Sequence, residues 1–449
     1  MLSRANAATI SPPAAGYKNL KFATPNGFLF PLSLRPPPIH PPIAGPRPLR
    51  LRAPPYAAPM APRRYWANLP ADLVAEIARC LPCVADRVGA ARACRAWLQG
   101  VLMDPCPLQL PWLLLPYQSA AALPPGGTRT ASFFCFLCNR THSVAVPDET
   151  GGARFFGAYP GGWLFLAYGQ SRRHGLVNLR TQGSLDLPYE AFTLGGSESQ
   201  HPVFIHAAVL SAPPDPLEGC IAAAIVTDLT PEYLLGPMHI TLWRMGSRLA
   251  SCLFQFDAED VIYHDGAFHF LSHGGDLLIC SPEFQDEEPL ERLHVRRKIR
   301  AMPGGYVLNA GAHYLVECRG ELLMVVRVQT HQEVTSEFKV FRITQEQTPD
   351  DDDAHDVWTV LPALDGRMLF VGRGCSGSYD TADFPGFQEG VYFLDDGNFH
   401  AAPMTRDGDA PPQYSCSNNG LWSGPPDHVR CWFPEQHPST YSSPVWFLH

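Results

Sequence analysis

The sequence lacks the features that most quickly identify a membrane protein or a nucleotide-dependent enzyme. No stretch reaches the roughly 18 consecutive apolar residues that a membrane-spanning helix needs. The nearest stretch, residues 108–117 (LQLPWLLLPY), is interrupted by proline. Neither a phosphate-binding loop nor a glycine-rich dinucleotide fingerprint occurs. We therefore expect no membrane association and no cofactor.

Acidic residues are absent from residues 1–71, which carry nine Lys or Arg residues. The rest of the chain holds 25 basic and 43 acidic residues, so its balance of −18 is partly masked in the net charge of −9. A protein that binds nucleic acid needs a basic face to contact the phosphates. The acidic body therefore argues against nucleic acid as a partner.

A disulfide framework is not indicated either. The 13 cysteines are odd in number and irregularly spaced, and no signal-peptide pattern occurs, which favours reduced thiols in a nuclear or cytoplasmic protein. Residues 135–138 (CFLC) and His142 supply three potential zinc ligands. A structural zinc site takes four ligands, usually from two such pairs, and the alternating apolar residues around Cys135 and Cys138 are typical of a strand. We therefore expect no metal.

Residues 1–60 contain fourteen prolines and no sustained hydrophobic periodicity. Such a segment buries too little apolar surface to offset its ordering entropy, so we expect it to be disordered or polyproline-like. Two alternatives stay open. The lack of acids and the scattered arginines fit an organellar transit peptide, although serine is sparse. Alternatively, Met60 stands at a natural start, and the residues before it are an inert extension.

A short helical patch, residues 64–104, follows this segment. Asn68 is a potential helix cap and Pro70 suits a first-turn position. An apolar stripe then recurs every four residues until Pro82 ends the helix, and further helical stretches begin near Asp86 and residue 91. Three short helices enclose too little core to stand alone, so part of the stripe needs a partner: the strand body of this chain or another protein. The stripe consists of Leu69, Leu73, Ile77 and Leu81, with Val74 beside them.

The residues of this patch resemble an F-box. The matching pattern is Leu69-Pro70-x-Asp72-Leu73-Val74-x-x-Ile77-x-x-x-Leu81, then Asp86, then Cys94-Arg95-x-Trp97. The resemblance implies that the patch binds a Skp-type adaptor and, through it, a cullin. Small residues at 89–91 depart from the larger or basic residues that the family often carries. The implied adaptor-binding residues are Leu69, Pro70, Leu73, Val74, Ile77, Leu81 and Val88, with Trp97 bracing the helices.

Residues 111–449 consist of short apolar or alternating runs separated by glycine-rich turns, which is typical of strands. Comparable first strands are predicted near Trp163, Val261, Tyr314 and Met368, at a period of ~50 residues that indicates propeller blades. We therefore predict a mainly β fold, a six- or seven-bladed β-propeller preceded by the three helices. The apolar run at residues 442–449 (SSPVWFLH) is predicted to lie beside residues 111–116 and to close the ring, because soluble chains rarely expose such a patch.

The C-terminal third resembles the plant KIB-type β-propeller domain (domain of unknown function 295). Residues 358–396 carry the resemblance, above all residues 369–372, 384–386 and 391–393, and the chain ends on PVWFLH. An F-box before such a propeller implies a non-catalytic substrate receptor of an SCF-type ubiquitin ligase, acting on an unknown protein substrate in the nucleus or cytoplasm. Two alternatives stay open: a propeller interaction protein that acts without the ligase, in an organelle if residues 1–60 direct it there, and a propeller enzyme.

No catalytic residue is predicted. His264, His269 and His273 lack nearby carboxylates at ligand spacing, so we interpret them as ordinary strand residues. Residues 374–378 (GCSGS) resemble a nucleophile elbow, but that motif requires a strand, a turn and a helix in sequence, and here it lies between predicted strands. The acidic run at residues 349–356 (PDDDDAHD) is interpreted as a solvated loop.

Overall fold

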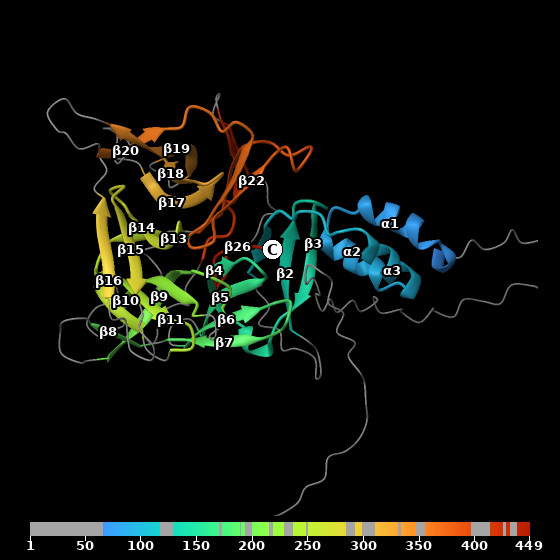
Figure 1. Ribbon diagram of the computed structural model, residues 1–449, viewed down its shortest axis with the longest axis horizontal. Coiled ribbons are helices and arrows are strands. Elements are labelled where there is room, and N and C mark those ends of the chain that lie inside the picture. Colours follow the sequence, from blue (N-terminus) through green and yellow to red (C-terminus); the bar gives the residue numbers. More distant parts are fainter. Residues whose placement is uncertain are drawn as a thin grey trace, which may run out of the picture.

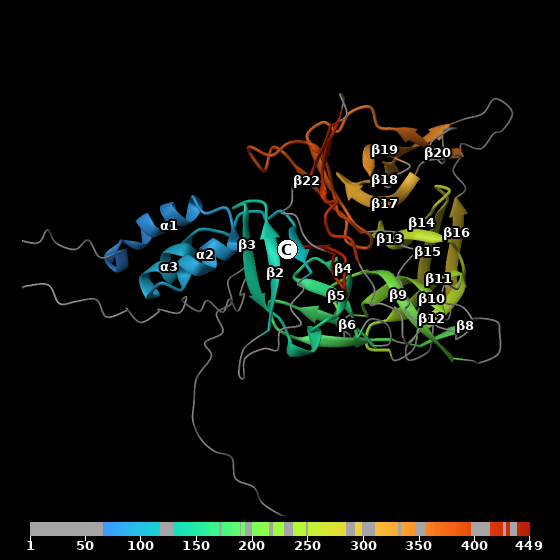
Figure 2. The same cartoon turned by 180° about the vertical axis from the view of Figure 1, so that it is seen from behind.

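The chain folds into a strand ring with three helices attached to one side, as Figure 1 shows for the computed structural model. Figure 2 shows the same arrangement from behind. Residues 1–60 and the acidic run at 349–354 lie outside the described residues, so the predictions made for them are not tested. The structure describes residues 66–116, 129–169, 173–188, 190–193, 200–214, 219–228, 237–247, 250–283, 292–298, 310–330, 334–346, 355–396, 414–424, 428–431 and 438–449.

Six sheets form the ring, which is a six-bladed β-propeller. The mainly β prediction is thus confirmed, and of the two predicted blade numbers six is correct. Blade 1 has the order β26-β1-β2-β3 and is built from β26 (Val445–Phe447), β1 (Trp112–Leu115), β2 (Thr130–Cys135) and β3 (Arg140–Ala145). After the 3-10 turn η2 (Asp148–Thr150), blade 2 contains β4 (Arg154–Tyr159), β5 (Trp163–Tyr168), β6 (Arg173–Asn178) and β7 (Ser184–Leu187).

Blade 3 differs from its neighbours, because β8 pairs with both β9 and β12 and closes the sheet on itself. Its strands are β8 (Glu190–Thr193), β9 (Gln200–Leu210), β10 (Ile221–Asp228), β11 (Met238–Arg244) and β12 (Ala250–Gln255). Blade 4 contains β13 (Ala258–His264), β14 (Ala267–Ser272), β15 (Leu277–Glu283) and β16 (Arg292–Lys298).

The last two blades complete the ring. Blade 5 contains β17 (Ala310–Cys318), β18 (Glu321–Gln329), β19 (Thr335–Glu346) and β20 (His355–Val360). Blade 6 has the order β22-β21-β23-β24-β25 and contains β21 (Arg367–Val371), β22 (Gly377–Asp380), β23 (Gly390–Phe393), β24 (Gly420–Ser423) and β25 (His428–Cys431).

The predicted first strands are mostly correct. Val261, Tyr314 and Met368 lie on β13, β17 and β21, each the first strand of its blade in sequence. The prediction for Trp163 is wrong, because Trp163 begins β5, the second strand of blade 2. The first strand is the preceding run, residues 154–159 (RFFGAY), which is mostly buried and pairs with β5 across the two-glycine turn at residues 161 and 162.

The C-terminal strand closes the ring, as predicted. β26 pairs antiparallel with β1 in the register Trp112↔Phe447, Leu113↔Trp446 and Leu114↔Val445. On its other side β26 lies next to β4 of blade 2. Trp446 is fully buried, and its Nε1 donates a hydrogen bond of 2.9 Å to the carbonyl oxygen of Val371 in blade 6. The last strand thus fastens blade 1 to both of its neighbours.

A buried carboxylate links three other parts of the ring. Asp260 on β13 accepts hydrogen bonds of 2.8 Å from the backbone N–H groups of Val261, Leu315 and Gly374. These donors belong to blades 4, 5 and 6, and Gly374 takes φ +63° where a Cβ would lie 2.9 Å from the Ala208 carbonyl oxygen of blade 3. Burial outweighs the three donors and raises the pKa of Asp260 to about 7.

The helical patch contains the three predicted helices, α1 (Ala71–Arg79), α2 (Val84–Ala91) and α3 (Arg95–Met103), after a 3-10 turn η1 (Trp66–Asn68). The predicted start of α1 is wrong by two residues. Asn68 belongs to η1, and Pro70 is the cap, with an extended ψ of 146° and a carbonyl that accepts the first helical hydrogen bond from Val74. Among the described residues no helix is both long and apolar enough to cross a membrane.

The patch docks on the outer edge of blade 1 through α2 (Figures 1 and 2). Cys83, Val84 and Ala85 are buried in the same apolar cluster as the strands of blade 1. Gln109 fixes the start of α2, because its Oε1 accepts from the backbone N–H of Val84 at 3.1 Å and its Nε2 donates to the Pro82 carbonyl at 2.9 Å. The patch therefore docks on the strand body through the start of α2, and not through the apolar stripe predicted to need a partner.

Candidate functional site

The outward side of α1 carries apolar residues that the fold does not cover. Leu73 is 48% exposed and Pro70 is exposed, while Leu69 and Ile77 are half-buried. We call these four residues the apolar face of α1. A soluble protein gains nothing from exposing a Leu-sized side chain on a short helix, since burying one is worth roughly 1.5–3 kcal/mol. The face is therefore a candidate contact surface.

Two of the residues implied by the F-box resemblance do not belong to this face. Val74 is fully buried and forms a small core with Ala78 and Val101. Val88 packs against the buried cluster of blade 1. Val74 therefore serves the core of the patch, and the half-buried Val88 contributes to the contact with the propeller. Leu81 lies beyond the end of α1 and is half-buried.

Trp97 acts as the brace that the sequence indicated. Its Nε1 donates a hydrogen bond of 2.9 Å to the carbonyl oxygen of Trp66, and the two rings lie 6.4 Å apart. This contact fastens η1, which precedes Leu69 and Pro70, to α3. Trp66 itself is 69% exposed and adds aromatic surface that sequence reasoning missed. Its position before the Leu-Pro pair was the available signal.

The serine motif has no catalytic arrangement in the part of the chain that the structure describes. Ser376 lies in the loop between β21 and β22, not before a helix, and its Oγ donates to the Gly372 carbonyl at 3.0 Å. Cys375 is buried, and burial raises the pKa of its thiol. The loop positions Gly374 for Asp260, so its glycines serve close packing at the centre of the ring.

The histidine interpretation was wrong in one respect, because His273 does have a carboxylate partner. Glu259 Oε1 lies 2.6 Å from His273 Nδ1, and Glu259 Oε2 lies 2.9 Å from His313 Nδ1. Hydrogen bonding to Glu259 raises the pKa of His273. The hairpin of β13 and β14 brings together residues 14 positions apart, which spacing in sequence did not indicate. His264 and His269 contact each other, with ring centroids 5.7 Å apart.

The cysteine pair at residues 135–138 is not isolated in the structure. Cys83, at the start of α2, joins Cys135, Cys138 and His142, and one potential ligand atom from each lies within 4.8 Å of the others. The argument against a metal rested on a missing fourth ligand and therefore does not hold. A signal was present in the sequence, because residues 80–83 (CLPC) form a second Cys-x-x-Cys pair.

The strand-rich part of the chain is similar to known proteins. Residues 133–418 match the KIB1-4 β-propeller family, whereas no curated protein sequence matches the chain. Among solved structures, the N-terminal domain of Nup159 aligns over 64% of this chain and 64% of its own length, less than two thirds, at 8% identity and a TM-score of 0.27. The GH43 β-1,3-galactosidase BT3683 aligns over 54% of this chain and 88% of its own (10% identity, TM-score 0.26). The allergen Mala s 1 of Malassezia sympodialis aligns over 66% and 91% (8% identity, TM-score 0.24).

Proposed function

Because the chain belongs to the KIB1-4 β-propeller family, we propose that it is a substrate receptor of an SCF-type ubiquitin ligase. The helical patch acts as an F-box that binds a Skp-type adaptor and thereby a cullin, and the propeller recruits a protein substrate in the nucleus or cytoplasm. The chain performs no bond chemistry itself. It accelerates ubiquitin transfer by raising the effective concentration of substrate beside the conjugating enzyme.

The observation that carries this proposal is the apolar face of α1. Leu69, Pro70, Leu73 and Ile77 match the F-box pattern and stay at least partly exposed, whereas Val74, Ala78 and Val101 form the small buried core of the patch. None of the four residues belongs to the apolar cluster through which α2 docks on blade 1. A partner can therefore cover the face without displacing the propeller.

The test measures the binding of purified Skp-type adaptor to the full chain and to a Pro70→Ala, Leu73→Ala double variant. Losing the burial of one Leu-sized side chain costs roughly 1.5–3 kcal/mol, and every 1.4 kcal/mol is about tenfold in affinity. We expect the double variant to bind at least about tenfold more weakly. Leu108→Ala is the matched control, since Leu108 is 64% exposed but lies outside the three helices.

The thermal midpoint of both variants should equal that of the unchanged chain, because neither alters a buried side chain. Equal adaptor affinity for the double variant and the Leu108 control would contradict the proposal. The second candidate function, a propeller interaction protein that acts without the ligase, is favoured by the small residues at 89–91. It predicts no measurable adaptor binding by the unchanged chain.

A further inference from the structure

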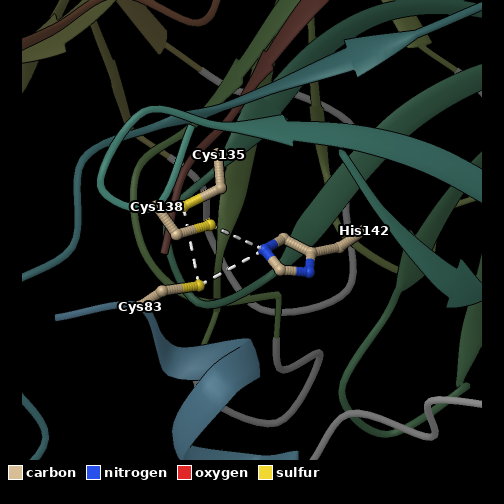
Figure 3. Close-up of side chains that lie close together, drawn as sticks. All are labelled: Cys83, Cys135, Cys138 and His142. Atoms are coloured by element: carbon tan, nitrogen blue, oxygen red, sulfur yellow. Dashed lines mark hydrogen bonds between the residues drawn. The ribbon is translucent and has the colours of Figure 1, made fainter. Parts of the chain in front are cut away.

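Four potential metal ligands from two separate parts of the chain converge where the helical patch meets blade 1 (Figure 3). Cys83 is the residue before α2. Cys135 ends β2, Cys138 lies in the turn of the β2–β3 hairpin, and His142 lies on β3. We call these four residues the Cys3His cluster. Its three cysteines are free thiols.

The distances within the cluster are close to those of a coordinated ion. Cys83 Sγ and Cys138 Sγ lie 3.3 Å and 3.1 Å from His142 Nε2, and Cys135 Sγ lies 3.6 Å from Cys83 Sγ. A tetrahedral zinc ion, with bonds of about 2.3 Å to sulfur and 2.0 Å to nitrogen, separates neighbouring ligand atoms by about 3.5–3.8 Å. The side chains therefore need to move apart only slightly to admit the ion.

The surroundings hold the ligands in place and still allow access. Cys83 and Cys135 are fully buried, while Cys138 and His142 are partly exposed, which leaves a path from solvent. The His142 ring stacks on Trp112 with centroids 5.2 Å apart, so that Nε2 faces the sulfurs. Beside the cluster, Arg140 Nη2 donates to Asp86 Oδ2 at 2.9 Å and joins the hairpin to α2 a second time.

Ordinary core packing does not account for this arrangement. A buried free cysteine usually packs as a small apolar residue, whereas here three thiols face one another and one imidazole nitrogen. We propose that the Cys3His cluster is a structural zinc site that fastens the helical patch to blade 1. Four protein ligands leave no open position, which distinguishes a structural site from a catalytic one. Three sulfurs and one imidazole suit Zn²⁺ better than an oxygen-seeking ion.

Zinc binding converts the three thiols to thiolates and releases their three protons, so the site is weaker in acid. The ion links residue 83 to residues 135–142 across the junction, and it fixes the angle between the patch and the propeller. The inference stands on the cluster alone and does not depend on the proposed ligase function.

The test begins with the full chain, purified without chelator, and measures metal content by mass spectrometry. We expect one zinc per chain for the unchanged protein and for Cys94→Ser, a cysteine outside the cluster. The Cys138→Ser variant should lose the zinc, and His142→Cys should retain it, because a fourth thiolate replaces the imidazole. The double variant Cys80→Ser, Cys83→Ser should also lose the zinc. Cys80 is changed together with Cys83 so that its thiol cannot replace that of Cys83 as a ligand.

To separate loss of the ion from misfolding of a ligand variant, the unchanged protein is also stripped with a chelator and reloaded with Co²⁺. We expect the thiolate charge-transfer absorption of tetrahedral Co²⁺, and faster tryptic cleavage of the helical patch in the stripped form than in the reloaded form. Two results would overturn the proposal: unchanged protein without zinc and without the Co²⁺ spectrum, or equal zinc content in Cys138→Ser and Cys94→Ser.

Discussion

The two edges of blade 1 are both completed by chain segments distant in sequence, but by different kinds of contact. At the inner edge, β26 adds a strand whose Trp446 and Phe447 are fully buried. At the outer edge, α2 buries Val84 and Ala85, and polar contacts of Gln109 and Arg140 and the Cys3His cluster add to this packing. The inner edge is therefore part of the propeller core, whereas the outer edge is an attachment.

The inner edge of blade 1 is therefore held by extensive packing, whereas the outer edge is held by a smaller set of specific contacts. Trp446 contacts Phe136 of the β2–β3 hairpin and Phe370 of β21, with ring centroids 5.8 Å and 5.1 Å apart. The packing of the inner edge thus also stabilises blade 6. The patch instead has its own small core of Val74, Ala78 and Val101. Damage at the inner edge should spread around the ring, and damage in the patch should stay local.

The largest expected effect follows removal of residues 441–449. The deletion exposes the apolar edge of β1 and removes the last strand, so we expect several kcal/mol of lost stability out of the 5–15 kcal/mol typical of a domain. Aggregated protein should result, measured as the soluble fraction after expression. The point variant Trp446→Ala tests the same contact without removing the strand and should lose about 3–5 kcal/mol of stability.

Val360→Ala is the control for both changes, because Val360 is a strand residue that is 41% exposed. The free energy of unfolding of Val360→Ala should stay within about 1 kcal/mol of that of the unchanged chain. If the deletion melted as the unchanged protein does and stayed soluble, β26 would not be part of the core, and the contrast between the two edges of blade 1 would disappear.

The inner edge could be predicted from sequence, because its signal is local. Residues 442–449 and 111–116 are both apolar runs that no soluble chain leaves bare, and a ring must join its last strand to its first blade. Turn glycines and the ~50-residue period likewise indicated the blades. The error at Trp163 arose because β4 and β5 are adjacent apolar runs, and either could have been first.

The outer edge could not be predicted as well, because its contacts join residues that are unremarkable one by one. Cys83 and Cys135 lie 52 positions apart, and only the docking of α2 on β3 makes them neighbours. The apolar stripe also did not show that Leu73 would be exposed and Val74 buried. Which side of α1 faces inward depends on its close packing against Gly100 of α3. There the helices pack so closely that a Cβ on Gly100 would lie 2.4 Å from Val74 Cβ.

The second prediction concerns Asp260, which ties blades 4, 5 and 6 together. In Asp260→Asn an NH2 group replaces one carboxylate oxygen and cannot accept a hydrogen bond. At least one buried backbone N–H group therefore loses its partner. We expect a loss on the order of 3 kcal/mol, measured by denaturant unfolding. Asp265→Asn is the control, because Asp265 lies in an exposed hairpin turn at φ 47° where asparagine is tolerated. Equal stability of the two variants would contradict the role of Asp260.

The third prediction tests whether the patch is energetically separate from the ring. Gly100→Ala places a methyl group against Val74 Cβ and the Ala71 carbonyl, and should destabilise the packing of α1 on α3 by on the order of 2 kcal/mol. Gly89→Ala is the matched control, because no atom lies within 4 Å of the position its Cβ would take. Hydrogen exchange should quicken in the three helices of Gly100→Ala and stay unchanged in the blades. Faster exchange throughout the propeller would show that patch and ring unfold as one unit.

The smallest expected effect concerns Glu259 on β13, which contacts His313 of blade 5 and, within blade 4, holds His273. Because Glu259 raises the pKa of His273 above its unfolded value of about 6.5, this pair adds stability that is complete below pH ~6.5 and is lost as the pH rises through the folded pKa. The His273 side chain is 45% exposed, so solvent screening limits the contribution to less than about 1 kcal/mol. Burial of Asp260 also makes stability fall with rising pH up to about 7. This slope is the same in the unchanged chain and in a His273→Gln variant, so it cancels when the two are compared. The stability difference between the unchanged chain and His273→Gln should therefore shrink from pH 6 to pH 8. A difference that is constant across this range would mean that His273 stays neutral and that its contact with Glu259 adds no pH-dependent stability, in contrast to the packing that holds the inner edge of blade 1.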